Sequence, residues 1–327
     1  MIRATAPVRE PQLREMPPLV ARRRPLPASP FELSILTLQL GPVRGPAGVG
    51  PLRAAVRRAR AAGITTFDLT EGPEPAVAES ILREAFPPGD AEVVVILPEG
   101  PSVPRAATGA GLETAPPLLP GAGRPGETGS FPRLYEVRPR AASGPRGFEP
   151  AVPPSRRVIR CRTAEEAEAI SGVPGPLLAA GPLSLLQHDL ANAVDAGRDP
   201  TSFAWIARDP FAGGRLDGSR FAVPRFAGGP VPAPATVRQL GSELESVLPF
   251  AFLARPGQRT LAQAAIRFPL ARRYVASVVI PVPAPERWEE IVGFAASPAL
   301  SDDEVARAAR VTRAAPAGPA GAPGDGP

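Results

Sequence analysis

The sequence contains no lysine, because all 37 of its lysine-or-arginine positions are arginine. Schiff-base catalysis requires a lysine amine, and a P-loop requires one to contact the nucleotide phosphates. Arginine replaces neither, since its guanidinium stays protonated throughout the physiological pH range. This absence excludes lysine-dependent enzymes, including reductases in which a lysine assists the proton donor.

Other reactive side chains are also scarce. His188 is the only histidine and Cys161 the only cysteine, so one chain forms neither a two-histidine metal site nor an internal disulfide. We therefore predict no metal. We expect Cys161 to be a buried thiol and His188 to be a structural or surface residue. Tyr135 and Tyr274 are the only tyrosines, and we expect Tyr135 to pack within the fold.

Long apolar segments are absent as well. No stretch approaches the roughly 20 apolar residues of a membrane span. Residues 1–10 include no apolar centre of a secretory signal. We therefore expect a cytoplasmic protein without membrane contacts.

Proline and glycine are abundant, at 47 and 32 residues, yet apolar residues still make up 43% of the chain. This balance indicates a folded domain with Pro/Gly-rich additions. We predict a disordered N-terminal arm over 1–30, one folded domain over 31–313 and a disordered Ala/Gly/Pro tail over 314–327.

The formal net charge is +5, and the arginines are spread along the chain. Their densest runs, Arg22–Arg24 and Arg57, Arg58 and Arg60, are not interleaved with aromatic residues as in many nucleic-acid-binding proteins. We interpret them as solvated surface. Nucleic-acid binding remains an alternative, and it would show steep salt dependence.

The folded part alternates between strand-like and helix-like segments. Short β-branched or apolar runs predict strands at Phe31–Leu40, Ile64–Phe67, Val93–Leu97, Leu134–Val137, Arg157–Cys161, Pro182–Gln187, Phe203–Ile206 and Val275–Ile280. Amphipathic runs predict helices at Leu52–Ala62, Ala76–Ala85, Ala164–Ile170, Asp189–Val194, Val237–Leu248, Thr260–Leu270, Glu286–Phe294 and Asp302–Val311. Eight strands alternating with helices predict an α/β fold, the (β/α)8 TIM barrel.

Two crossover helices are missing from this pattern. Pro98–Pro132 and Pro139–Pro154 are rich in proline and glycine where helices should connect successive strands. We predict that loops stand there in place of one or two crossover helices.

Three segments in order resemble the aldo-keto reductase family, whose members are NADP-dependent oxidoreductase barrels. Arg57–Asp68, followed by Glu79–Leu82, is similar to a family helix, its "GInxFDTA" strand end and its "SExxLG" helix. Phe203–Gly218 is similar to the "SPLxxGxLxG" segment after strand 7. Thr260–Phe268, leading to Val278–Pro281, resembles "TxAQxALrf…svIPG". The resemblance covers most of the folded part and implies the same barrel.

The resemblance also implies a catalytic tetrad of Asp, Tyr, Lys and His, of which this chain keeps little. Asp68 matches the aspartate. Pro73 stands at the tyrosine position, Pro98 (or Leu97) at the lysine position and Arg138 at the histidine position. The tyrosine of the family delivers a proton with help from the lysine cation. We therefore interpret the chain as a degenerate member without this chemistry.

The residues that the resemblance assigns to NADP(H) are only partly present. Gln187 matches the glutamine that contacts the nicotinamide amide. The phosphate loop survives at Asp209, Phe211, Gly213 and Gly214, whose backbone N–H groups suit an anion. Val282–Ala284 replaces the glycine and basic residues that hold the adenosine phosphate, and the acidic segment Glu286–Glu290 follows.

Arginines also stand at or near three expected strand ends, on the face where barrel sites are built. If Arg138, Arg162 and Arg208 pointed inward together, they would form an anion pocket, because arginine forks suit carboxylates and phosphates. The alternative is coincidence, since arginine is about one residue in nine here.

Two functional hypotheses follow. The first is a pseudoenzyme of the aldo-keto reductase type that binds a nucleotide or anionic ligand, or a protein partner that the sequence does not identify. The second is an NADP(H)-dependent oxidoreductase that acts on carbonyl substrates and uses Asp68 as an atypical acid. The first predicts no carbonyl turnover, whereas the second predicts slow turnover that depends on Asp68.

Overall fold

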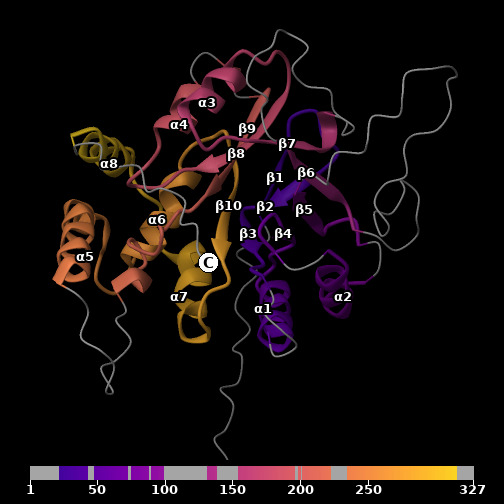
Figure 1. The fold of residues 1–327 in the computed structure, drawn as a ribbon, viewed down its shortest axis with the longest axis horizontal. Helices are drawn as coiled ribbons and strands as arrows, with labels where there is room; N and C mark the ends of the chain where they lie inside the picture. Colours follow the sequence, from indigo (N-terminus) through magenta and orange to yellow (C-terminus); the bar gives the residue numbers. More distant parts are fainter. Residues whose placement is uncertain are drawn as a thin grey trace, which may run out of the picture.

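The protein folds around a closed barrel of eight parallel strands, in the order β10-β3-β4-β5-β6-β7-β8-β9 (Figure 1). The computed structural model describes residues 22–42, 48–72, 75–87, 90–98, 131–137, 154–195, 198–199, 201–221 and 234–314. The barrel strands are β3 (Leu36–Gln39), β4 (Thr66–Asp68), β5 (Val94–Pro98), β6 (Arg133–Val137), β7 (Arg157–Arg160), β8 (Leu177–Pro182), β9 (Phe203–Arg208) and β10 (Val275–Pro281). The predicted (β/α)8 barrel is therefore confirmed.

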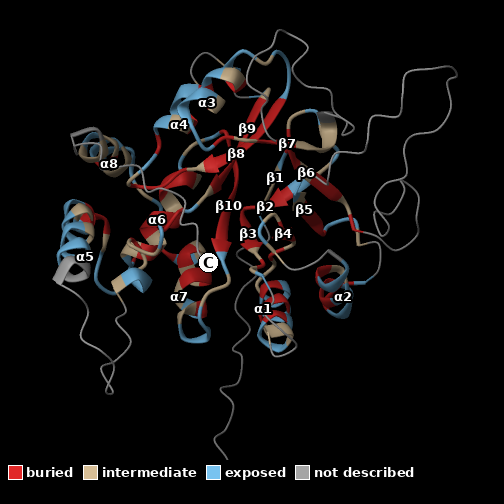
Figure 2. Cartoon of the chain, in the orientation of Figure 1, coloured by how far each residue is buried: buried red, intermediate tan, exposed pale blue. Residues whose placement is uncertain are grey.

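Helices surround the strands and turn their exposed faces outward (Figure 2). The α-helices are α1 (Val49–Ala61), α2 (Pro75–Ala85), α3 (Ala164–Ser171), α4 (Asp189–Asp195), α5 (Pro234–Val247), α6 (Leu261–Leu270), α7 (Trp288–Val292) and α8 (Asp302–Ala314). The 3₁₀ turns are η2 (Pro154–Arg156), η3 (Ser219–Phe221), η4 (Leu248–Leu253), η5 (Pro285–Arg287) and η6 (Gly293–Ala296). None of the described helices is both long and apolar enough to cross a membrane.

Alternation along the strands divides the core into two layers. One layer fills the inside of the barrel and includes Ile96, Leu134 and Ile206. The other lies between the strands and the helices and includes Trp205 and Phe268. Polar side chains continue the inner layer at the carboxyl ends of the strands, where the candidate site lies.

A hairpin precedes the barrel, formed by β1 (Arg23–Pro25) and β2 (Glu32–Ser34). Leu26 and Leu33 are buried with the inner layer. The guanidinium of Arg24 donates to the Leu270 carbonyl at 3.2 Å and thereby satisfies an acceptor at the end of α6. Residues 22–30, which the sequence analysis assigned to a disordered arm, therefore belong to the folded domain. The other predicted disordered residues, 1–21 and 315–327, lie outside the described residues.

One predicted strand is wrong. The strand expected at Pro182–Gln187 is instead β8, Leu177–Pro182, and a turn built on Ser184 follows it. Gly181 lies inside β8, and this position requires glycine because residues next to β7 and on β9 approach it closely. A Cβ there would stand 2.2 Å from the Cys161 carbonyl oxygen and 2.8 Å from the Trp205 ring. A glycine usually marks a strand end, but here it marks a close approach inside a strand.

The remaining expected elements appear with boundaries shifted by a few residues, and Glu286–Phe294 is divided among η5, α7 and η6. The Thr163 side chain accepts a hydrogen bond from the Glu166 N–H and so caps α3. Residues 99–130 and 138–153 lie outside the described residues, so the predicted loops in place of crossover helices stay a prediction.

Candidate functional site

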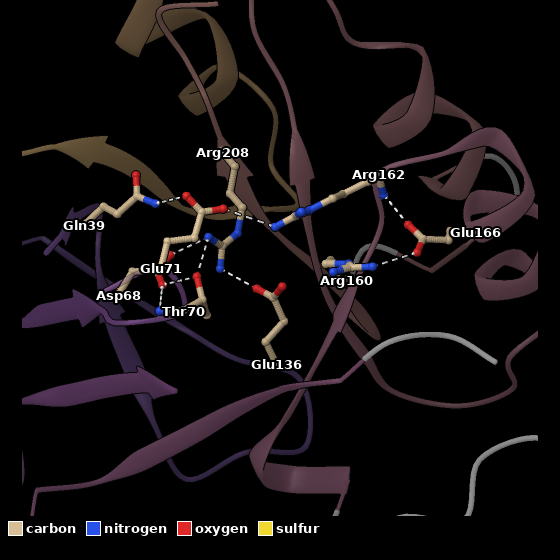
Figure 3. Close-up of polar contacts among 9 residues, drawn as sticks. All are labelled: Gln39, Asp68, Thr70, Glu71, Glu136, Arg160, Arg162, Glu166 and Arg208. Atoms are coloured by element: carbon tan, nitrogen blue, oxygen red, sulfur yellow. Dashed lines mark hydrogen bonds and ion pairs between the residues drawn. The ribbon is translucent and has the colours of Figure 1, made fainter. Parts of the chain in front are cut away.

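Charged side chains gather at the carboxyl ends of the barrel strands, referred to below as the mouth. Asp68 ends β4, Glu136 lies near the end of β6, and Arg208 ends β9. Each follows an inward-facing residue by two positions, so alternation aims it inward as well. Figure 3 shows Arg208 reaching between the two carboxylates.

Asp68 is fully buried, and both of its carboxylate oxygens have partners. Oδ1 accepts hydrogen bonds from the Thr70 backbone N–H at 2.9 Å and from the Thr70 hydroxyl at 2.7 Å. Oδ2 lies 2.6 Å from Nη1 of Arg208. Asp68 therefore both anchors a turn after β4 and shares a buried ion pair.

The Arg208 guanidinium serves a second carboxylate. Its Nη2 donates to Oε2 of Glu136 at 2.5 Å, and its Nη1 also donates to the Thr70 hydroxyl at 3.0 Å. One cation thus pairs with two carboxylates, so the three side chains carry one formal negative charge in excess. We refer to Asp68, Arg208 and Glu136 as the mouth triad.

The surroundings of Glu136 in the mouth triad shift its pKa. Burial raises the pKa of this carboxyl above its usual range, and the neighbouring Asp68 carboxylate adds to the effect. Arg208, Arg162 and Arg160 oppose the rise. Glu136 therefore holds a proton at a higher pH than an ordinary glutamate.

Sequence matching missed Glu136 and Thr70. It compared the end of β6 with a family histidine and stopped at Arg138. Arg138 lies outside the described residues. The alternation of Leu134 and Glu136 on β6 was a signal that could have identified Glu136, because Leu134 is fully buried in the inner layer.

Arg162 and Arg160 also have acidic partners. Arg162 pairs with Glu71 at 3.2 Å, where both side chains are about half exposed. Arg160 pairs with Glu166 at 3.3 Å (Figure 3). The structure thus balances Arg162 and Arg208 with carboxylates. The predicted anion pocket with Arg138 remains a prediction.

No tyrosine of this chain faces the mouth. Tyr135 is adjacent to Glu136 on β6 and so points to the opposite side of the sheet. Tyr274 precedes β10 at the other end of the barrel, where its ring packs 5.4 Å from Phe203. Pro98 ends β5 beside Glu136, and Pro73 lies outside the described residues. Asp68 therefore has neither a phenol of this chain nor a lysine beside it.

The segment Asp209–Phe221, referred to below as the β9 loop, folds tightly after β9. Asp209, Ala212, Gly213 and Gly214 all have positive φ angles, between 49° and 84°. Oδ1 of Asp209 accepts a hydrogen bond from the Gly213 N–H at 2.7 Å. Phe211 is buried beneath the loop. The predicted phosphate loop is thus a rigid turn, and the N–H of Gly213 is already engaged.

Other backbone donors of the β9 loop are available. Within the described part of the chain, the N–H groups of Gly214, Arg215, Asp217 and Gly218 donate to no protein acceptor. A side chain at Gly214 would meet the Ser219 hydroxyl at 2.4 Å, so this position requires glycine. Unpaired N–H groups on a loop after the seventh barrel strand are suited to binding a phosphate.

A surface pocket of about 290 Å³ adjoins the β9 loop. It lies between that loop and residues of α5, α6 and α7. Its lining is mainly apolar, with one basic and two acidic residues: Arg215, Leu216, Asp217, Gly218, Phe221, Leu244, Val247, Leu261, Ala262 and Glu290. We call it the α5–α7 pocket.

Gln187, the predicted nicotinamide contact, is exposed and lies five residues beyond β8. Its assignment to a strand end depended on the wrong strand boundary. His188 is buried against the Phe268 ring, at 5.8 Å between centroids. Cys161 is also buried, and burial raises its pKa to about 12. Among the described residues, no three His, Cys, Asp or Glu side chains form a group suited to a metal.

Comparison with solved structures identifies the same fold elsewhere. The apo form of aldo-keto reductase AKR11C1 from Bacillus halodurans matches with a TM-score of 0.56 and 15% identity, over 90% of this chain and 97% of the other. Its holo form matches with a TM-score of 0.53, at the same identity and coverage. No protein-family model and no curated protein matches the sequence. The chain therefore has the fold of the aldo-keto reductases, as the resemblance implied.

Proposed function

We propose that the protein is a nucleotide-binding barrel of the aldo-keto reductase type that has lost the carbonyl reduction of that family. The mouth triad carries this proposal. Arg208 forms ion pairs with the carboxylates of Asp68 and Glu136. These pairs lie at the end of the barrel where the family resemblance places the proton-donating tetrad. A guanidinium remains protonated near neutral pH and does not shuttle a proton.

Asp68 is a poor substitute for the missing acid. Its Oδ1 accepts two hydrogen bonds from Thr70, and its Oδ2 faces a permanent cation. Both oxygens of this carboxylate are therefore already engaged by side-chain or backbone donors of the chain. The alternative in which Asp68 is the acid therefore has less support than the binding hypothesis.

Nucleotide binding is supported by the β9 loop and the α5–α7 pocket. The N–H groups of Gly214 and Arg215 would bind phosphate oxygens. Gly218 belongs to both the loop and the pocket, so one ligand could contact both. The apolar lining near Leu244 and Phe221 suits a planar base.

The fit to NADP(H), which the resemblance implies, is incomplete. The β9 loop suits phosphates, and a bound nicotinamide nucleotide would supply hydride chemistry. The residues after β10 do not suit an additional adenosine phosphate, because Val282–Ala284 provides no cation there. Gln187 is exposed in the segment between β8 and α4.

Isothermal titration calorimetry of the full chain with NADH, NADPH and ADP tests the proposal. We expect at least one nucleotide to bind, and we expect no nucleotide oxidation with activated aldehydes. Leu244→Trp should weaken binding by filling the pocket, since Leu244 lines it and is 46% exposed. Leu248→Trp is the matched control, because Leu248 is 59% exposed and does not line the pocket. Absence of binding by every nucleotide would refute the proposal.

One observation favours a second candidate, an oxidoreductase with an atypical acid. Glu136 lies in the mouth triad, and burial raises its pKa, so it would hold and release a proton near the barrel mouth. This candidate predicts aldehyde-dependent nucleotide oxidation that Glu136→Gln abolishes. Asp68→Asn is the comparison variant, because it tests Asp68, the acid that the sequence predicts, in place of Glu136.

A further inference from the structure

We propose that the α5–α7 pocket selects an adenine nucleotide with a free ribose 2′-hydroxyl and rejects one with a 2′-phosphate, and that Glu290 makes this distinction. The inference rests on the proposed nucleotide function and specifies its ligand. It departs from NADP(H), which the family resemblance implies.

The size of the pocket limits which part of a nucleotide it can hold. Its volume is about 290 Å³, just below the roughly 300–1,000 Å³ typical of small-molecule pockets. This space suits a base with its sugar rather than a whole dinucleotide. The adjacent N–H groups of the β9 loop would then bind the phosphates that follow the sugar.

The charges of the lining disfavour an additional phosphate. Asp217 and Glu290 contribute two negative charges, and Arg215 contributes the single positive charge. Arg287, which pairs with Glu290, brings the sum of these charges to zero, so a phosphate dianion would be desolvated there without a net electrostatic attraction. A neutral hydroxyl needs no such attraction, because its desolvation costs far less than that of an ion.

The other arginine near the pocket floor is already engaged. The Arg287 Nε lies 2.7 Å from Oε2 of Glu290, and its Nη2 donates to the Asp217 carbonyl at 2.7 Å. These contacts link α7 to the β9 loop and occupy the guanidinium from two sides. A 2′-phosphate could recruit Arg287 only by breaking both contacts.

The rim provides little more positive charge. Arg220 is held by Glu243 through two contacts, the shorter at 2.9 Å. Glu286 in η5 and Glu289 in α7 add two further acidic side chains, both exposed. Among the described residues, Arg215 is therefore the one arginine at this part of the site without an ion-paired carboxylate, and its Nε already donates to the Ala212 carbonyl at 2.8 Å.

Glu290 remains able to accept a hydrogen bond from a ribose. Its Oε2 faces Arg287, whereas its Oε1 meets no donor within the described part of the chain. The Gln263 side chain donates to the Glu290 carbonyl at 2.9 Å and thereby holds this residue of α7 against α6. Acidic residues that accept from the 2′-hydroxyl favour NAD over NADP in other nucleotide-binding folds.

Calorimetry on the full chain tests the inference with two pairs of probes that differ only in the 2′-phosphate, NADH against NADPH and AMP against adenosine 2′,5′-bisphosphate. We expect the ligand without a 2′-phosphate to bind at least about tenfold more tightly in each pair. Glu290→Gln should reduce this preference, and Glu290→Arg should reverse it. Glu289→Gln is the matched control, because Glu289 adjoins Glu290 but does not line the pocket. Thermal unfolding of each variant verifies that it is folded.

The outcomes separate this inference from the proposed function. Binding of both members of each pair with equal affinity, or tighter binding of the 2′-phosphates, overturns the inference and leaves nucleotide binding intact. An unchanged preference in Glu290→Gln likewise overturns the role of Glu290. Failure of every nucleotide to bind overturns the proposed function itself, and the inference with it.

Discussion

Arg208 on β9 and Asp68 on β4 form a buried ion pair across the mouth of the barrel, with Nη1 and Oδ2 2.6 Å apart. Strands β10 and β3 separate the two residues in the sheet order. The pair therefore ties opposite parts of the barrel together. It also provides Asp68 with a cationic partner in a chain that contains no lysine.

Removing the Arg208 guanidinium should lower the free energy of unfolding substantially. Arg208→Met leaves two buried carboxylates, Asp68 and Glu136, without their shared partner, and we expect a loss of about 3–5 kcal/mol in unfolding free energy. Urea denaturation measures this change. Arg162→Met is the control, because Arg162 and Glu71 are about half exposed, and we expect a loss below about 1 kcal/mol.

A double variant examines the coupling directly. Asp68→Asn combined with Arg208→Met removes one of the stranded charges, so the total loss should be smaller than the sum of the two single losses. Strict additivity would contradict an energetic link between Asp68 and Arg208.

The order of elements was largely predictable, because amphipathic and apolar periods reveal helices and buried strands locally. The first hairpin strand was missed because prolines surround Arg23–Pro25, and its burial depends on Leu26 reaching the barrel interior. The end of β8 was misplaced because Gly181 looks like a boundary when its crowded neighbours are unknown.

The candidate site was less predictable than the fold. Asp68 and Arg208 were each identified, but their pairing joins strands that are far apart in the sequence, and no local pattern reveals it. Glu136 was overlooked because matching to a family motif considered one position per strand end. The α5–α7 pocket combines residues of a loop and three helices, so its charge balance emerges only after folding.

The pH dependence of stability should identify Glu136. Burial raises its folded-state pKa, so the folded protein binds this proton more tightly than the unfolded chain does. The stabilisation is complete below the ordinary pKa of glutamate and is lost as pH rises through the raised value. As pH rises above the ordinary pKa of glutamate, the wild type should lose unfolding free energy relative to Glu136→Gln. The opposite slope would contradict this assignment.

Gly181 should tolerate no side chain. Gly181→Ala would place a Cβ 2.2 Å from the Cys161 carbonyl oxygen, where backbone must move, and we expect a loss of at least about 2 kcal/mol. Gly172→Ala is the matched control. Its nearest atom would lie 3.9 Å away and its φ is −80°, so we expect a change within about 1 kcal/mol. Equal effects of the two variants in urea denaturation would show that the close approach is absent.

Cys161 should be almost inert in the folded protein. Burial raises its pKa from 9.0 to about 12, and the Glu166 carboxylate contributes to this rise. Because the thiolate is the reactive form, Ellman's reagent near pH 8 should modify the native protein at least about a hundredfold more slowly than the urea-unfolded chain. By the same linkage, the stabilisation from this thiol is present below pH 9.0 and is lost as pH rises through about 12, a loss that Cys161→Ala should not show. Equally fast modification of the native and unfolded protein would mean that the end of β7 opens readily, contrary to the closed barrel.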